Sequence, residues 1–132
     1  MSKNVYKSIF EKLQKIGILD GHGEMRVNYM KFASPGMMDL SVDRLWNDNI
    51  AIAHNGKQNG DVMADPDMEI KIFPVQKAAE ALTFKNDYVG IYQEVYGENG
   101  ECSPRLKKDL NNFLNYWLEN IIDQKYVKVE EE

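Results

Sequence analysis

Residues 50–72, IAIAHNGKQNGDVMADPDMEIKI, hold two segments in which apolar residues occupy every second position. Isoleucine alternates with alanine in residues 50–53, and apolar side chains alternate with charged ones in residues 67–72. A period of two places successive side chains on opposite faces of a β-strand, so each segment predicts a strand with one buried face. Asn59-Gly60 lies between them and favours the tight turn of a β-hairpin. The stretch therefore predicts antiparallel β-structure in the middle of the chain.

The register of this hairpin requires one extra residue. Uninterrupted pairing from a turn at Asn59-Gly60 would put Ile52 opposite Asp67, which conflicts with the alternation of both strands. A β-bulge at Asp65-Pro66 removes the conflict, because proline lacks the N–H for a ladder hydrogen bond and collects at bulges and edges. We therefore expect a long hairpin with a bulge.

The same stretch is rich in carboxylates that could bind a metal. Asp61, Asp65, Asp67 and Glu69 follow His54, and carboxylate oxygens are the ligands that hard divalent cations prefer. Strand alternation puts Asp67 and Glu69 on one face, roughly 7 Å apart along the backbone, which is close enough to share a metal. The spacing does not fit the calcium-binding loop pattern. The sequence therefore favours turn formers and a solvated strand face over a metal site.

The segments near both ends predict helices. In residues 3–17 the apolar side chains form one stripe, and Gly17 is suited to end that helix in a left-handed conformation. Residues 103–126, SPRLKKDLNNFLNYWLENIIDQKY, begin with Ser103 as a cap and Pro104 at the first helical position, and their apolar residues share one face. Both helices are expected to be amphipathic.

Further strands are predicted between the helices. Residues 38–43 alternate with a period of two, and residues 25–32 are a more mixed strand candidate. The sum is an α+β fold, with an antiparallel sheet of about five or six strands, a meander, between an N-terminal and a C-terminal amphipathic helix. Residues 1–127 are expected to form this single domain, and residues 128–132 to be an acidic, disordered tail.

Residues 81–95, ALTFKNDYVGIYQEV, predict the last hairpin of the sheet. A two-residue turn at Asn86-Asp87 tolerates left-handed backbone conformations and fixes a register. That register gives four pairs, Phe84 with Val89, Leu82 with Ile91, Lys85 with Tyr88, and Ala81 with Tyr92. The first two pairs lie on one face and the last two on the other, so the apolar residues collect on one side.

The face of the sheet away from the helices is expected to stay partly open, because two adjacent helices cover much of one face only. The predicted register places four candidate partner-binding residues there, beside Ala79, Ala81 and Gly90: Tyr88, Tyr92, Glu94 and Tyr96. Tyrosine is enriched in interface hot spots, and Trp46, in the turn RLWNDN, is a fifth candidate. The alternative is that these tyrosines cover the sheet or pack against the chain's own loops.

Composition restricts the partner and the location. The chain has 132 residues, a formal net charge of −5 and a pI of about 5.1, so its field repels phosphate backbones and disfavours direct nucleic-acid binding. The opening residues lack the features of a signal peptide, and no apolar run reaches the roughly 18 to 20 residues that cross a bilayer. The sequence predicts a cytoplasmic protein with no membrane span, and favours a protein partner over a small molecule.

Few residues offer other chemistry. Cys102 precedes the last helix, whose dipole could activate a thiol, but no histidine lies near it in sequence and an exposed thiol is favoured. A zinc site would need His22, His54 and Cys102 from three distant segments. His54 could act as a general base oriented by Asp65, although a histidine at a strand end is more often a hydrogen-bonded edge residue. No G-x-S-x-G motif or phosphate-binding glycine loop is present.

Two stretches carry a resemblance to a known family. The chain resembles an uncharacterised domain family of phages, plasmids and integrative elements, in which G-D-x-M-x-D-P-x-M precedes N-D-Y-x-G-x-x-Q. The matching residues are Gly60, Asp61, Met63, Asp65, Pro66 and Met68, then Asn86, Asp87, Tyr88, Gly90 and Gln93. The resemblance runs from about Met38 to the end of the last helix. It implies a small accessory protein of phage or mobile-element origin and assigns no activity, cofactor or catalytic residue.

The sequence therefore favours a non-enzymatic protein-interaction protein of this origin, with no cofactor. The alternative is a metal-dependent hydrolase that uses Asp61, Asp65, Asp67 and Glu69 as ligands and His54 as base, and a divalent cation is the cofactor that it would need. The two hypotheses differ in whether these side chains converge, which the fold decides.

Overall fold

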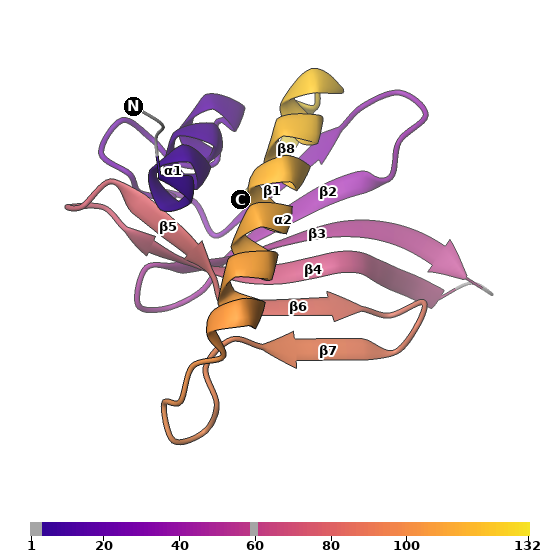
Figure 1. The fold of residues 1–132 in the computed structure, drawn as a ribbon. Coiled ribbons are helices and arrows are strands. Elements are labelled where there is room, and N and C mark those ends of the chain that lie inside the picture. Colours follow the sequence, from indigo (N-terminus) through magenta and orange to yellow (C-terminus); the bar gives the residue numbers. More distant parts are fainter. Residues whose placement is uncertain (1–3, 59–60) are drawn as a thin grey trace.

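The computed structural model describes the backbone of residues 4–58 and 61–132 and, within these ranges, the side chains outside residues 57–65. Two helices, α1 (Val5–Ile16) and α2 (Pro104–Asp123), lie on the same face of an antiparallel sheet (Figure 1). The chain is thus an α+β protein, as the sequence predicts. The strands are β1 (Tyr29–Ala33), β2 (Asp39–Arg44), β3 (Asn49–Gln58), β4 (Asp61–Phe73), β5 (Ala78–Ala81), β6 (Thr83–Asn86), β7 (Ile91–Glu94) and β8 (Val127–Glu131).

The sheet has eight strands in the order β7-β6-β4-β3-β2-β1-β8, and β5 also pairs with β4. The predicted five or six strands are therefore too few, and only β1 to β4 form a meander. One cause is Leu82, whose N–H donates to the carbonyl of Glu69 over 2.8 Å. This residue separates β5 from β6, and the two short strands pair with different parts of β4.

The second cause is β8, which replaces the expected disordered tail. It pairs antiparallel with β1, with Met30 opposite Glu131 and Ala33 opposite Val127. Lys125 adopts a left-handed backbone conformation (φ 58°) directly after α2, where the chain reverses. An edge strand keeps charged side chains in solvent, so the acidic composition does not prevent backbone pairing. The C-terminal helix is consequently not the last element of the fold.

The second helix begins where the sequence predicts, and the first begins at Val5, close to the predicted start at residue 3. The side chain of Asn4 accepts the N–H of Lys7, and α1 ends at Gly17, whose φ is 98° and whose N–H bonds back to the last turn. Ser103 caps α2 by accepting the N–H of Leu106, and Pro104 occupies its first turn. These local signals set the helix boundaries because they pair backbone groups that the helix itself leaves unpaired.

The β3–β4 hairpin contains the predicted bulge. Ile52 pairs with Met68, and the register shifts between Ala53 and Asn55, so that residues 65 and 66 together lie opposite residue 54. The shift keeps the apolar side chains of both strands on the face that the helices cover, which is the reason for the prediction. The predicted turn at Asn59-Gly60 lies outside the described residues.

The predicted register of the β6–β7 hairpin is wrong. Lys85 pairs with Tyr92 and Phe84 with Gln93, so residues 87–90 form a loop longer than the expected two-residue turn. Gly90 supplies a left-handed position in this loop (φ 67°), and the side chain of Asn86 accepts the N–H of Tyr88 over 3.0 Å. Phe84 packs edge-on against Phe113 of α2, with ring centroids 5.6 Å apart. Packing against the helix therefore replaces the predicted contact between Phe84 and Val89.

The hydrophobic core lies between the two helices and the sheet. Its largest fully buried side chains come from both layers and from the loop after α1: Ile9, Phe10, Leu13, Ile18, Phe32, Leu40, Ile50, Ile52, Met68, Ile70, Leu114 and Leu118. The helices run side by side in the same direction, because Ser8 bonds to Asn115 and Lys12, one turn later, pairs with Glu119. With both helices on one side, the opposite face of the sheet is left for other contacts (Figure 1).

Candidate functional site

The open face, meaning the face of the sheet opposite the helices, is dominated by charged residues. Cross-strand pairing assigns seven carboxylates and three ammonium groups with described side chains to it. The carboxylates are those of Asp39, Asp43, Asp67, Glu69, Glu80, Glu94 and Glu130, and the ammonium groups are those of Lys31, Lys71 and Lys85. The excess of carboxylates makes this face electronegative.

Asp67 lies in the middle of the open face, between Ala53 of β3 and Lys85 of β6. Burial raises the pKa of Asp67, and the charges of Glu69 and Asp87 raise it further, against the opposing effect of Lys85. A carboxylate with a raised pKa is one whose charge the surroundings stabilise less well than water does. The attraction of Lys85, which also forms an ion pair with Asp87 at 3.4 Å, therefore offsets only part of the cost of burying the Asp67 charge.

Tyr92 is an exposed aromatic residue of the open face. It pairs with Lys85, lies on the same side of β7 as Glu94, and is 57% exposed. Burial of its hydroxyl raises the pKa of Tyr92, and the nearby charges of Glu94 and Glu69 raise it further. An exposed tyrosine among carboxylates offers an apolar ring together with a protonated hydroxyl donor.

The other predicted partner-binding residues lie elsewhere. Tyr96 donates its hydroxyl to both carboxylate oxygens of Glu80 at 3.1 Å. The hydroxyl of Tyr88 fills the space beside Gly56, which alternates with Ile52 on the helix-covered side of β3. Trp46 is 81% exposed in the turn between β2 and β3. Of the four residues predicted on the open face, only Tyr92 and Glu94 share its β7 surface.

The residues predicted to neighbour these tyrosines also differ. Ala79 and Ala81 are fully buried, and they pair with Ile72 and Ile70 on the helix-covered side. The predicted aromatic platform with small neighbours is therefore wrong. It depended on the register of the β6–β7 hairpin, and a longer loop changes the residues that lie beside one another.

The structure divides the predicted metal-binding residues between the two faces of the sheet. Asp67 and Glu69 share the open face, as strand alternation predicts, whereas His54 alternates with Ile52 on the helix-covered face. The side chains of Asp61 and Asp65 are outside the part of the chain whose side chains the structure describes. Among the described residues, no three His, Cys, Asp or Glu side chains are grouped so as to hold a metal ion. The hydrolase hypothesis is not favoured by this arrangement.

His54 takes part in a hydrogen-bond chain that the sequence analysis missed. The indole N–H of Trp117 donates to its Nδ1 over 3.2 Å, and its Nε2 lies 3.2 Å from the hydroxyl of Tyr126. An indole N–H can only donate, so Nδ1 is the acceptor, and the Tyr126 hydroxyl itself donates to the carbonyl of Met38 over 2.7 Å. Both ring nitrogens thus hold structural hydrogen bonds, which disfavours a role as general base or metal ligand.

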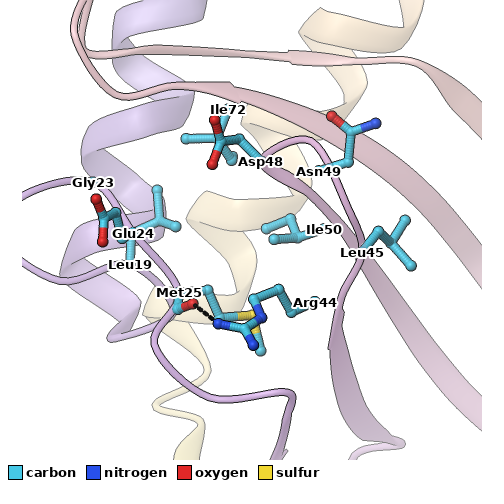
Figure 2. Close-up of a pocket in the computed structure, with 10 residues that line it drawn as sticks. All are labelled: Leu19, Gly23, Glu24, Met25, Arg44, Leu45, Asp48, Asn49, Ile50 and Ile72. Carbon is cyan, nitrogen blue, oxygen red and sulfur yellow. Dashed lines mark hydrogen bonds between the residues drawn. The ribbon is translucent and has the colours of Figure 1, made fainter.

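A small cavity lies between the loop after α1 and the turn between β2 and β3 (Figure 2). Its apolar walls include Leu19, Met25 and Ile72, and the guanidinium of Arg44 is turned toward the carbonyl of Met25, to which it donates over 3.3 Å. The cavity measures about 130 Å³. Ligand-binding pockets usually measure about 300 to 1,000 Å³, so this cavity is too small for most substrates or cofactors.

Cys102 is an exposed free thiol whose backbone forms an isolated bridge with Tyr96. Among the described residues, Cys102 is not part of any group of three or more His, Cys, Asp or Glu side chains that could hold a metal ion. The thiol therefore adds no second chemical group to the open face.

In the part of the chain that the structure describes, no helix combines the length and the apolar composition needed to cross a membrane.

A family model with the description "Domain of unknown function (DUF6908)" matches residues 4–127. No curated protein and no solved structure matches the chain. The matched range begins at the cap of α1 and ends at the first residue of β8, so it includes both helices and strands β1 to β7.

Proposed function

The chain belongs to the family described as Domain of unknown function (DUF6908), and we propose that it is a non-enzymatic protein-interaction protein. Its open face binds a partner protein with a basic surface. The observation that carries this proposal is the uncovered sheet face itself, because α1 and α2 both pack on the other side (Figure 1). A sheet face that no element of its own chain covers is available for a partner.

Charge decides the class of partner. Seven carboxylates and three ammonium groups give the described part of the open face an excess of negative charge. Complementary potentials steer encounter and exclude partners of the same sign, so lysine- and arginine-rich protein surfaces are favoured and phosphate backbones are disfavoured. The raised pKa of Asp67 points the same way, since a bound cation would stabilise this carboxylate.

Tyr92 supplies the apolar contact of the proposed interface. Interfaces combine a buried aromatic anchor with a polar rim, and Tyr92 is an exposed ring surrounded by Glu69, Glu94 and Lys85. Trp46, 81% exposed, would extend the contact toward the turn between β2 and β3. Tyr88 and Tyr96 are not part of the proposed interface, because they contact other parts of the chain.

A phage or mobile-element origin is part of the proposal. It is supported by the resemblance of residues 60–68 and 86–93 to the paired signature of that family. A small accessory protein of such an element acts on proteins of its host, and many host proteins that handle nucleic acid have basic surfaces. A basic host protein is therefore the partner class that both arguments favour.

Charge reversal on the open face tests the proposal. The variant Asp43→Lys/Glu69→Lys should lose the host proteins that the wild type captures from a bacterial lysate, because it reverses two charges at the centre of the face. The matched control is Glu98→Lys/Asp109→Lys, which changes the net charge equally at exposed positions of the loop before α2 and of α2 itself. Equal capture by the wild type and both variants would remove the open face from the proposal.

The captured proteins supply a second readout. Those that depend on the open face should be basic and should elute at moderate salt, since surface electrostatics is screened within about 10 Å at 0.1 M ionic strength. A set of acidic or salt-resistant proteins lost by the open-face variant would contradict the stated partner class. Tyr92→Ala should weaken the same captures without changing their salt dependence.

A further inference from the structure

A groove of about 440 Å³ lies beside β5, where the first turns of α1 and α2 approach this strand. Its volume is within the range of small-molecule sites, about 300 to 1,000 Å³, unlike the cavity in Figure 2. Tyr6 of α1, Phe73 of β4, and Ala78 and Ala79 of β5 form its apolar lining. Ala78 leaves the volume open, because a longer side chain at this position would enter the groove.

The polar edge of the groove is a connected group of side chains. Glu80, 9% exposed, accepts the hydroxyl of Tyr96 and forms an ion pair with Lys107, whose Nζ lies 3.4 Å from a carboxylate oxygen. The Lys107 ammonium also lies 5.6 Å from the ring centre of Tyr6 and 5.7 Å from that of Tyr96. Cation–π contacts and the ion pair hold the ammonium at a fixed place beside the apolar lining.

The charge of this group remains positive. The hydrogen bond with Tyr96 and the charge of Glu80 raise the pKa of Lys107, so its ammonium stays protonated at neutral pH. Lys7, which is exposed, also lines the groove, and Glu80 is its one carboxylate. Two ammonium groups against one carboxylate leave an excess of one positive charge, in contrast to the protein as a whole, whose net charge is −5.

We propose that this groove binds a small aromatic carboxylate. The ring lies against Tyr6, Phe73 and the methyl group of Ala78, and the carboxylate faces the ammonium groups of Lys107 and Lys7. Glu80 does not repel this ligand, because Tyr96 and Lys107 already hold its oxygens. The site uses none of the residues changed in the test of the open face, which are Asp43, Glu69 and Tyr92, and it is independent of the partner protein proposed above.

The ligand class is tested with three probes of similar size, by following backbone amide shifts of the full chain in a heteronuclear NMR titration. Benzoate should shift the amides of Tyr6, Lys7 and Ala78 in a saturable way, with an affinity near millimolar for a fragment of about nine non-hydrogen atoms. Two further probes should bind at least about tenfold more weakly, which corresponds to about 1.4 kcal/mol of binding free energy. Benzylamine reverses the charge, and cyclohexanecarboxylate removes the aromatic ring.

Variants test the location. Ala78→Leu fills the groove and should abolish the saturable shifts, and its own spectrum shows whether the fold is kept. Lys7→Gln should weaken benzoate binding about threefold to tenfold, whereas Lys15→Gln, an equal charge change at the other end of α1, should leave it unchanged. Absence of saturable benzoate shifts, equal binding of benzylamine, or equal effects of the two lysine variants would each overturn the proposal.

Discussion

The indole N–H of Trp117 donates a hydrogen bond to Nδ1 of His54 over 3.2 Å and thereby joins the second half of α2 to the middle of β3. The two rings also meet edge-on, with centroids 5.2 Å apart. Trp117→Phe keeps the ring packing and leaves Nδ1 without this donor, so we expect a loss of about 1–3 kcal/mol in the free energy of unfolding. Urea denaturation measures it.

Tyr116→Phe is the matched control for that prediction, because Tyr116 lies one residue earlier on α2 and is 66% exposed. It should change the free energy of unfolding by less than about 0.5 kcal/mol. Combining Trp117→Phe with His54→Leu should cost less than the sum of the single changes, since each removes the other's partner. Additive losses would show that the hydrogen bond contributes nothing.

Asn111 is fully buried, and its side chain hydrogen-bonds to the backbone at the end of β5. Its Oδ1 accepts the N–H of Ala81 over 2.8 Å, and its Nδ2 donates to the carbonyl of Lys107 over 2.7 Å. Asn111→Ala leaves the Ala81 N–H buried without a partner, so a loss of about 1–3 kcal/mol is expected in thermal or urea unfolding. Asn112→Ala, on the exposed side of the same turn, should be neutral or slightly stabilising. Equal effects of both changes would contradict the assigned bond.

Gly23 is required by the ring of Phe10. Its φ is 81°, and a Cβ at this position would lie 2.6 Å from Cζ of Phe10, which is 1% exposed. Gly23→Ala should therefore cost about 1–3 kcal/mol through overpacking and backbone strain. Gly21 in the same loop has no atom within 4 Å of a built Cβ, so Gly21→Ala should change the melting temperature little or raise it. The prediction fails if the two variants melt together.

Asp67→Asn tests the charge state of the open face. Because burial raises the pKa of Asp67 above its ordinary value of 3.8, the folded state binds this proton more tightly than the unfolded state. Its ionisation thus lowers stability as the pH rises from the unfolded pKa through the higher folded pKa. The variant should melt a few degrees above the wild type at pH 7, and this difference should shrink as the pH falls toward 3.

Asp109→Asn, at an exposed position of α2, provides the control for the pH series. A difference between Asp67→Asn and the wild type that stays constant from pH 7 to pH 3 would show that the effect comes from shape rather than from charge. A lower melting temperature at pH 7 would show that the ionised form of Asp67 is favoured by Lys85 more than it is disfavoured by burial.

Local signals in the sequence predicted the helices and the bulge. Gly17, Ser103 and Pro104 act on backbone groups within one helical turn, so their effects follow from a few neighbouring residues. The bulge at residues 65 and 66 follows from alternation alone, since any other register would turn apolar residues toward solvent. Such features depend on short segments and are accessible without the fold.

Tertiary contacts determine the features that the sequence did not predict. The register of β6 and β7 depends on the packing of Phe84 against Phe113, which is 29 positions later in the chain. His54 carried a usable signal, because it continues the buried alternation of Ile50 and Ile52 and so had to face a helix. The groove near Lys107 carried none, since its lining comes from both helices and two strands.

The pairing of β8 with β1 has a consequence for biosynthesis. Met30 pairs with Glu131, which is translated about a hundred residues later. Strand β1 therefore has an unpaired edge while the rest of the sheet assembles. Contacts of such long sequence separation slow folding, and an uncovered edge can pair with another nascent chain. Strand β8 therefore closes the molecule last, and the yield of soluble protein should depend on how soon after translation it docks.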